Sequence, residues 1–205
     1  MKRRKYLTIS ILCLMLTVLF TFNIGAVEYT TLGYRGIGGS GTVFLQNHLD
    51  SSIYRDYLDD AVSAWNDAVV LGRSFVVNTQ AGSIVYNFDF STSVNPEYHD
   101  LHEREVVAVT VYWGQSTANC TCHTTYAFDI ICNDALLANQ SVKYKKATLV
   151  HELGHTLGLK DYDESYYDYV NQSIMCYGTN FNHYWRPFQF DIDNAEDCWA
   201  PHYGS

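Results

Sequence analysis

The feature that most constrains this chain is the run of residues 151–161, which reads His-Glu-Leu-Gly-His-Thr-Leu-Gly-Leu-Lys-Asp. Residues 142–157 return to a helical period and predict one long helix that includes most of this run. Side chains four residues apart share a helix face, so His151 and His155 are expected to reach one metal ion together. Glu152 projects beside them, where it can take a proton from a metal-bound water.

The sequence after the helix supplies a third metal ligand. Gly158 can adopt the positive φ that ends a helix and turns the chain sharply. We expect this turn to bring Asp161, ten residues after His151, back beneath the same ion. Asp163 is a competing ligand, and we favour Asp161 because of its register with Gly158. Three protein ligands with the fourth position left to water are typical of a catalytic zinc. The predicted ligands are His151, His155 and Asp161.

Residues 151–161 resemble the extended zinc motif of the metzincin metalloproteases, and residues 173–177, Ser-Ile-Met-Cys-Tyr, resemble their Met-turn. The resemblance implies that Met175 forms an apolar floor under the imidazoles. It also implies a catalytic role for Tyr177, because in astacins and serralysins a tyrosine at this place donates to the oxyanion. Most metzincins have histidine as the third ligand, whereas Asp161 is similar to the small secreted proteases of the snapalysin branch.

Two looser similarities extend the resemblance over most of the chain. Residues 61–65 are similar to the first helix of matrixins, and residues 187–194 are similar to the start of their C-terminal helix. The metzincin resemblance implies an α+β fold, with a twisted, mainly five-stranded sheet, two long helices and a C-terminal helical subdomain.

The hydrophobic pattern outside the motif predicts the same class of fold. Apolar residues at helical spacing predict a helix over residues 53–69, between a cap at Asp50 or Ser51 and a stop at Gly72. A final short helix is predicted to begin near Pro187. Strands are predicted where aromatic and β-branched residues dominate, at residues 42–46, 75–78, 83–90, 106–113 and 125–131.

Residues 1–26 have the features of an export signal, with four basic residues before an almost wholly apolar stretch and a small residue at Ala26. We expect cleavage there and secretion of residues 27–205 as one metalloprotease domain; the alternative is that the stretch stays as a membrane anchor.

The expected mature chain has 9 Lys and Arg against 22 Asp and Glu, a formal charge of −13. Such an acidic chain is not expected to bind nucleic acid or a membrane surface.

Five cysteines lie in the expected mature chain, at positions 120, 122, 132, 176 and 198. Outside the cell they are expected to form at most two disulfides, and the alternative is that all five are buried thiols.

An acidic run at Asp161, Asp163, Glu164 and Asp168 suggests calcium binding. We favour a solvated loop, because the alternating Asp and Gly of a calcium loop is missing.

These observations predict a monomeric zinc endopeptidase that hydrolyses internal bonds of protein or peptide substrates, with Glu152 as the general base. The substrate is expected to lie along an edge strand, for which residues 125–131 are the candidate, and near a side-chain pocket at residues 177–184. The alternative function is a zinc-containing module that binds protein without cutting it. Glu152 argues against that alternative, because a structural zinc site needs no base.

Overall fold

The computed structural model describes residues 35–37, 41–68, 73–78, 83–115, 124–162, 170–177 and 179–199. The expected export signal at residues 1–26 lies outside these ranges, as do Cys120, Cys122 and the competing ligand Asp163. Glu164 and Asp168 of the acidic run are outside them too, so calcium binding there stays untested.

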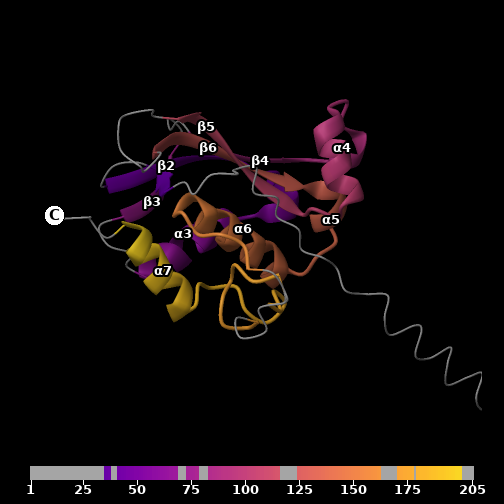
Figure 1. The fold of residues 1–205 in the computed structure, drawn as a ribbon. Helices are drawn as coiled ribbons and strands as arrows, with labels where there is room; N and C mark the ends of the chain where they lie inside the picture. Colours follow the sequence, from indigo (N-terminus) through magenta and orange to yellow (C-terminus); the bar gives the residue numbers. More distant parts are fainter. Residues whose placement is uncertain are drawn as a thin grey trace, which may run out of the picture.

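The centre of the fold is one mixed sheet with the strand order β1-β6-β4-β2-β3, in which β5 also pairs with β6 (Figure 1). All pairings are parallel except β5 with β6, which is antiparallel. The five predicted strands are present, and a short sixth strand, β1, adds to the beginning of β6. The strands are β1 (Arg35–Ile37), β2 (Gly41–His48), β3 (Arg73–Val77), β4 (Ser83–Phe88), β5 (Ala108–Gln115) and β6 (Thr124–Asn133).

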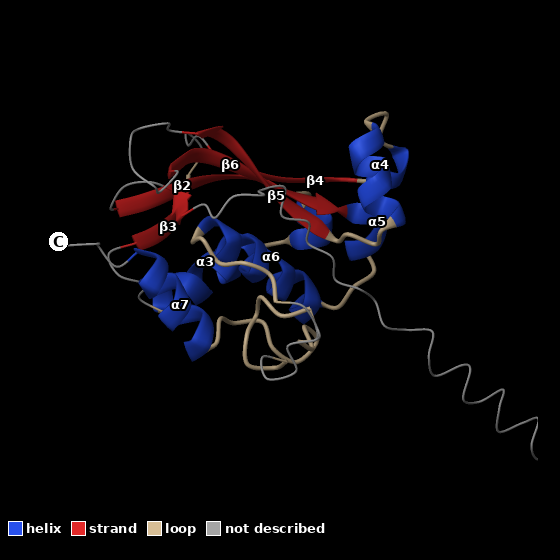
Figure 2. Cartoon of the chain, viewed as in Figure 1, coloured by secondary structure: helices blue, strands red, loops and turns tan. Residues whose placement is uncertain are grey.

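Two helices pack together on the inner face of this sheet, α3 (Tyr57–Asp67) and α6 (Val142–Thr156) (Figure 2). The Trp65 indole, almost fully buried, donates from Nε1 to the carbonyl oxygen of Val150 at 2.8 Å and so fixes α3 against α6. Inward-facing residues of β2, β4 and β6 complete this main core. The predicted α+β architecture is therefore confirmed.

A second, smaller core covers the opposite face of the sheet. It lies beneath the 3₁₀ turn η1 (Phe90–Thr92) and helix α4 (Pro96–Glu103), and its buried centre includes Phe90, Leu101 and Ile131. The sequence analysis missed α4, although Pro96 at the first turn and the Asn95 cap, which accepts from the Glu97 amide at 3.0 Å, mark its start.

The helix predicted over residues 53–69 is wrong in one respect: it is two helices, α2 (Ser51–Tyr54) and α3. Asp50 caps α2 as predicted, accepting from the Ser52 amide at 2.8 Å. The break follows at Arg55, whose φ of 45° lies in the left-handed region and stops the helical hydrogen bonding. The side chains keep their apolar spacing across the break, which is why the pattern did not reveal it.

The predicted substrate edge at residues 125–131 is also wrong, because β6 is an interior strand. Its partners are β5 on one side and β4 on the other. Among the strands that the structure describes, β5 pairs only with β6, so β5 is the edge strand on this side of the sheet.

The remaining helices are a short α5 (Asp134–Leu137) before α6, and α7 (Gln189–Trp199), which begins two residues after the predicted Pro187. Cys132 and Cys176 are buried, and neither forms a disulfide. Cys120 and Cys122 lie outside the described residues, so the disulfides predicted among the other cysteines stay untested. No helix in the described ranges is long and apolar enough to cross a membrane.

Candidate metal centre

Helix α6 carries three of the predicted site residues, and its start is well defined. The Ser141 hydroxyl oxygen accepts from the Tyr144 amide at 3.1 Å, a standard N-cap that fixes where the helix begins. From Tyr144 to its end the helix is almost wholly buried. His151, Glu152 and His155 are 1%, 1% and 3% exposed, so this helix carries its polar groups inside the protein.

Gly158 ends α6 as the sequence predicted. Its φ is 91°, and its amide donates to the His155 carbonyl at 2.8 Å, while the Leu159 amide donates back to the Gly154 carbonyl at 3.2 Å. This pair of bonds is the Schellman arrangement, which needs a residue with positive φ at the position of Gly158. The reversed chain then brings Asp161 to the histidines.

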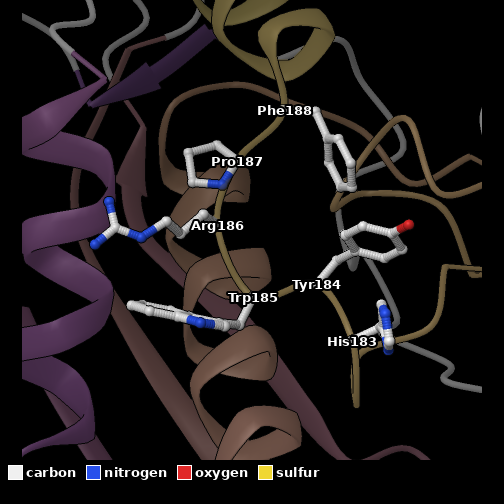
Figure 3. Close-up of a pocket in the computed structure, with 6 residues that line it drawn as sticks. All are labelled: His183, Tyr184, Trp185, Arg186, Pro187 and Phe188. Atoms are coloured by element: carbon white, nitrogen blue, oxygen red, sulfur yellow. The ribbon is translucent and has the colours of Figure 1, made fainter.

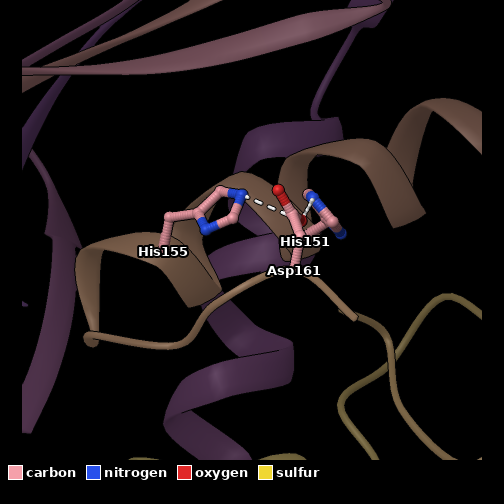
Figure 4. A group of neighbouring side chains, drawn as sticks. All are labelled: His151, His155 and Asp161. Carbon is pink, nitrogen blue, oxygen red and sulfur yellow. Dashed lines mark ion pairs between the residues drawn. The ribbon is translucent and has the colours of Figure 1, made fainter. Parts of the chain in front are cut away.

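The ligand atoms of His151, His155 and Asp161 converge within 4.8 Å of one another (Figure 4). Asp161 Oδ1 lies 3.0 Å from His151 Nε2 and 3.4 Å from His155 Nε2. Zinc with tetrahedral bonds of 2.0–2.2 Å keeps its ligand atoms about 3.3–3.6 Å apart, so these separations are close to those a zinc ion requires.

The polar atoms at this point lack other partners. Among the residues that the structure describes, five buried side-chain nitrogen or oxygen atoms have no hydrogen-bond partner, and four belong to this group. Buried polar atoms normally have partners, and a bound ion is one accepted reason for exceptions. The four atoms are His151 Nε2, His155 Nε2, Asp161 Oδ1 and Glu152 Oε1. The donor set therefore fits a divalent metal of the zinc type.

The second nitrogen of each imidazole is bound to the backbone. His151 Nδ1 lies 2.9 Å from the Ile174 carbonyl oxygen, and His155 Nδ1 lies 3.0 Å from that of Leu159. A carbonyl only accepts, so each Nδ1 carries a proton, and in the neutral ring each Nε2 has the lone pair that a metal needs. The ring orientations are thus fixed from outside the ligand set.

In the metal-free protein, neighbouring site residues shift the pKa values of His151 and Asp161. Burial lowers the pKa of His151, but the neighbouring Asp161 carboxylate outweighs it and raises that pKa to about 9, with a smaller contribution from Glu152. Burial alone raises the pKa of Asp161, yet His155, His151 and the Tyr177 hydroxyl together hold it below its usual range. The pocket thus favours a cationic partner for the Asp161 carboxylate.

Glu152 lies beside the ligands with its two carboxylate oxygens in different surroundings. Oε2 accepts a hydrogen bond from the hydroxyl of Thr110, on β5, at 2.6 Å. Oε1 is buried without a partner. One oxygen is therefore held, and the other is left to accept a proton.

Met175 is fully buried and packs directly on the site helix. A Cβ added at Gly154 would lie 2.6 Å from Met175 Sδ, closer than real Cβ atoms come to a heavy atom, and 3.2 Å from Trp65 Cζ2, which is a tight contact. Gly154 lies between the two histidines in the sequence, and only glycine at this position lets Met175 pack so close to α6. The need for glycine at position 154 could not be predicted from the sequence, because Met175, which contacts it, is 21 residues away.

Residues 173–177 are held to α7 by Asp191. Its buried carboxylate accepts from the Ile174 and Phe188 amides, both at 2.8 Å, and from the Ser173 hydroxyl. Burial raises the pKa of Asp191, and the three donors oppose that shift. Since the Ile174 carbonyl accepts from His151, Asp191 anchors the residue whose carbonyl orients a predicted ligand. The sequence analysis missed this residue.

Tyr177 donates from its hydroxyl to Asp161 Oδ2 at 2.7 Å. The bridge between Tyr162 and Cys176, with the Tyr162 amide donating to the Met175 carbonyl at 2.8 Å, aligns the two segments that carry this pair. The predicted catalytic tyrosine thus contacts the third predicted ligand, and the five predicted site residues lie together.

A surface pocket of about 260 Å³ is lined by consecutive residues 183–188 (Figure 3). The Trp185 ring lies under Lys146 Nζ at 5.0 Å, and Arg186 extends to Asp67 at 3.3 Å, so this segment is attached to α6 and α3. The pocket overlaps the predicted range 177–184 only at His183 and Tyr184, and the predicted side-chain pocket stays a prediction.

Comparison of the chain with protein-family models and with curated proteins gave no match. The assignment of a function therefore depends on the residues and their geometry.

Proposed function

We propose that the chain is a zinc-dependent endopeptidase of the metzincin type, exported and monomeric, that cuts internal bonds of protein substrates. The observation that carries the proposal is the convergence of His151 Nε2, His155 Nε2 and Asp161 Oδ1 beside a buried Glu152 oxygen without a partner. A zinc ion with these three ligands would supply an acidified water and polarise the scissile carbonyl.

Within this proposal, Glu152 is the general base. Its Oε1 takes the proton of the attacking water and then delivers it to the leaving amine. Burial at 1% exposure keeps bulk water from competing for that oxygen. Tyr177 is the proposed oxyanion donor; in this role its hydroxyl leaves Asp161 Oδ2 and turns to the developing negative charge.

The proposed substrate site runs along β5. Strand β6 pairs with β5 over residues 125–132 and with β4 over residues 129–133, whereas β5 has a described partner only at β6. An extended peptide can pair with the backbone of such an edge, which gives affinity with little dependence on sequence. Because Thr110 of β5 contacts Glu152, a peptide on this edge would pass beside the proposed base.

Export is proposed from the sequence of residues 1–26 alone. The acidic composition supports a substrate other than nucleic acid.

The direct test is incubation of purified protein with unfolded casein, with and without a chelator, alongside metal analysis. We expect about one zinc per chain, loss of hydrolysis on chelation and recovery when zinc is restored. Zinc binding with no hydrolysis of unfolded protein would favour the non-catalytic zinc module. Absence of bound zinc would contradict both functions.

A further inference from the structure

The Thr110 side chain carries a buried hydroxyl on the inner face of β5. It is 4% exposed, and its neighbours on β5, Ala108 and Val109, are fully buried hydrophobic residues. Alternation along the strand points Thr110 towards α6 and Val109 towards the second core. A hydroxyl in such a place is costly unless it makes a hydrogen bond.

The partner of this hydroxyl is Glu152 in both of its contacts. The Thr110 oxygen lies 2.6 Å from Glu152 Oε2 and 3.2 Å from the Glu152 backbone oxygen. A hydroxyl has one proton, and the shorter, charged acceptor takes it. The hydroxyl therefore ties the end of the Glu152 side chain to β5 while the helix holds its backbone.

This contact determines which carboxylate oxygen is available. With Oε2 engaged, the rotation of the carboxylate is fixed and Oε1 is the oxygen without a partner. Proton transfer requires a base within hydrogen-bond reach and in the right direction, so a fixed carboxylate is more effective than a rotating one.

We propose that Thr110 is a positioning residue for Glu152: its hydroxyl holds Oε2 so that Oε1 faces the reacting water. This inference rests on the proposed peptidase function. Under this inference β5 has two roles: its edge binds the peptide backbone, and its Thr110 orients the proposed base Glu152.

The test compares Thr110→Val, which keeps the shape and removes the hydroxyl, with Thr110→Ser, which keeps the hydroxyl. The matched control is Thr148→Val: Thr148 is 1% exposed on the same helix as Glu152, and its hydroxyl donates to a backbone acceptor, the Tyr144 carbonyl, at 3.0 Å. For all variants kcat, KM, zinc content and the thermal midpoint are measured, and the structure of metal-free Thr110→Val is determined.

We expect Thr110→Val to lower kcat by about 10- to 100-fold, the range for a lost hydrogen bond to a charged group, with KM and zinc content unchanged. Thr110→Ser should keep most of kcat, and Thr148→Val should lose stability without losing kcat. In metal-free Thr110→Val the Glu152 carboxylate should no longer hold one orientation.

A kcat for Thr110→Val within about threefold of the native value would overturn the inference, as would a Thr110→Ser variant as slow as Thr110→Val. A parallel loss of zinc or of kcat in Thr148→Val would show a structural effect and also overturn it. If the native protein hydrolyses casein with zinc while Thr110→Val is unimpaired, only the positioning role fails. If the native protein does not hydrolyse casein, the proposed function fails first and the inference with it.

Discussion

The hydroxyl of Tyr177 lies 2.7 Å from Asp161 Oδ2, while Asp161 Oδ1 lies 3.0 Å from His151 Nε2. The two oxygens of one carboxylate are thus divided between a phenol and the ligand cluster. This arrangement favours a carboxylate that binds metal through one oxygen, with the tyrosine holding the other in place.

Tyr177→Phe keeps the ring and deletes the hydroxyl. If the phenol is the oxyanion donor, kcat should fall about 100-fold with KM little changed, since one such donor is typically worth about 2.7–4 kcal/mol. Zinc affinity should fall as well, by about tenfold, because the partner of a ligand is lost. Steady-state kinetics and a chelator titration separate the two effects. A near-native kcat with weakened zinc binding would restrict Tyr177 to orienting Asp161.

Asp161→Ala should weaken zinc binding by more than about 100-fold, the upper end of the loss caused by removing a partner of a ligand. Asp163→Ala is the control, because it removes an equal charge two residues away in the sequence. Metal analysis after dialysis against a graded series of free zinc measures both. Equal losses in the two variants would show that Asp161 is not the ligand.

Much of the site could be predicted because its signals are local. The spacing of His151 and His155 within one helix, and the glycine that allows the turn at Gly158, are properties of a few consecutive residues. Asp161 and Tyr177 were also predicted to lie at the metal, and they do lie together.

What the sequence did not reveal depends on contacts between distant segments. Thr110 and Glu152 are 42 residues apart, and Asp191 on α7 binds residues 173 and 174 of the preceding segment. A polar residue at an inward position of an apolar strand was the available signal for Thr110. The interior place of β6 could not be read from alternation, because a strand paired on both sides and an edge strand share the same pattern of side chains.

Gly154→Ala tests the packing of Met175 on α6. An added methyl in a filled core typically costs about 1–3 kcal/mol, whereas Gly to Ala within a helix gains about 0.5–1 kcal/mol, so the net effect should be destabilising. In a Met175→Ala background the clash with Sδ is absent, and the same substitution should become neutral or stabilising. Denaturant unfolding of the four proteins gives the coupling. If Gly154→Ala lowered the free energy of unfolding in both backgrounds, the contact between Gly154 and Met175 would be contradicted.

Asp191→Ala should lower the free energy of unfolding by about 2–4 kcal/mol, because it leaves the Ile174 and Phe188 amides and the Ser173 hydroxyl without their acceptor. Asp193→Ala, an exposed acidic residue on the same helix, is the matched control and should change stability by no more than about 0.5 kcal/mol. Thermal or denaturant unfolding checks both values. A loss as small as that of the control would show that the turn keeps its conformation without Asp191.

The proposed peptidase activity requires the buried Glu152 beside the three predicted metal ligands. It is tested most directly by kcat/KM of Glu152→Ala on a casein-derived peptide, measured together with zinc content. Glu103→Ala, at an exposed carboxylate on α4, serves as the control and should behave as the native protein. We predict native zinc content and a rate about 10²–10⁴ lower for Glu152→Ala, the usual contribution of a general base. Retention of more than about a tenth of the native rate by a zinc-loaded Glu152→Ala would contradict the account.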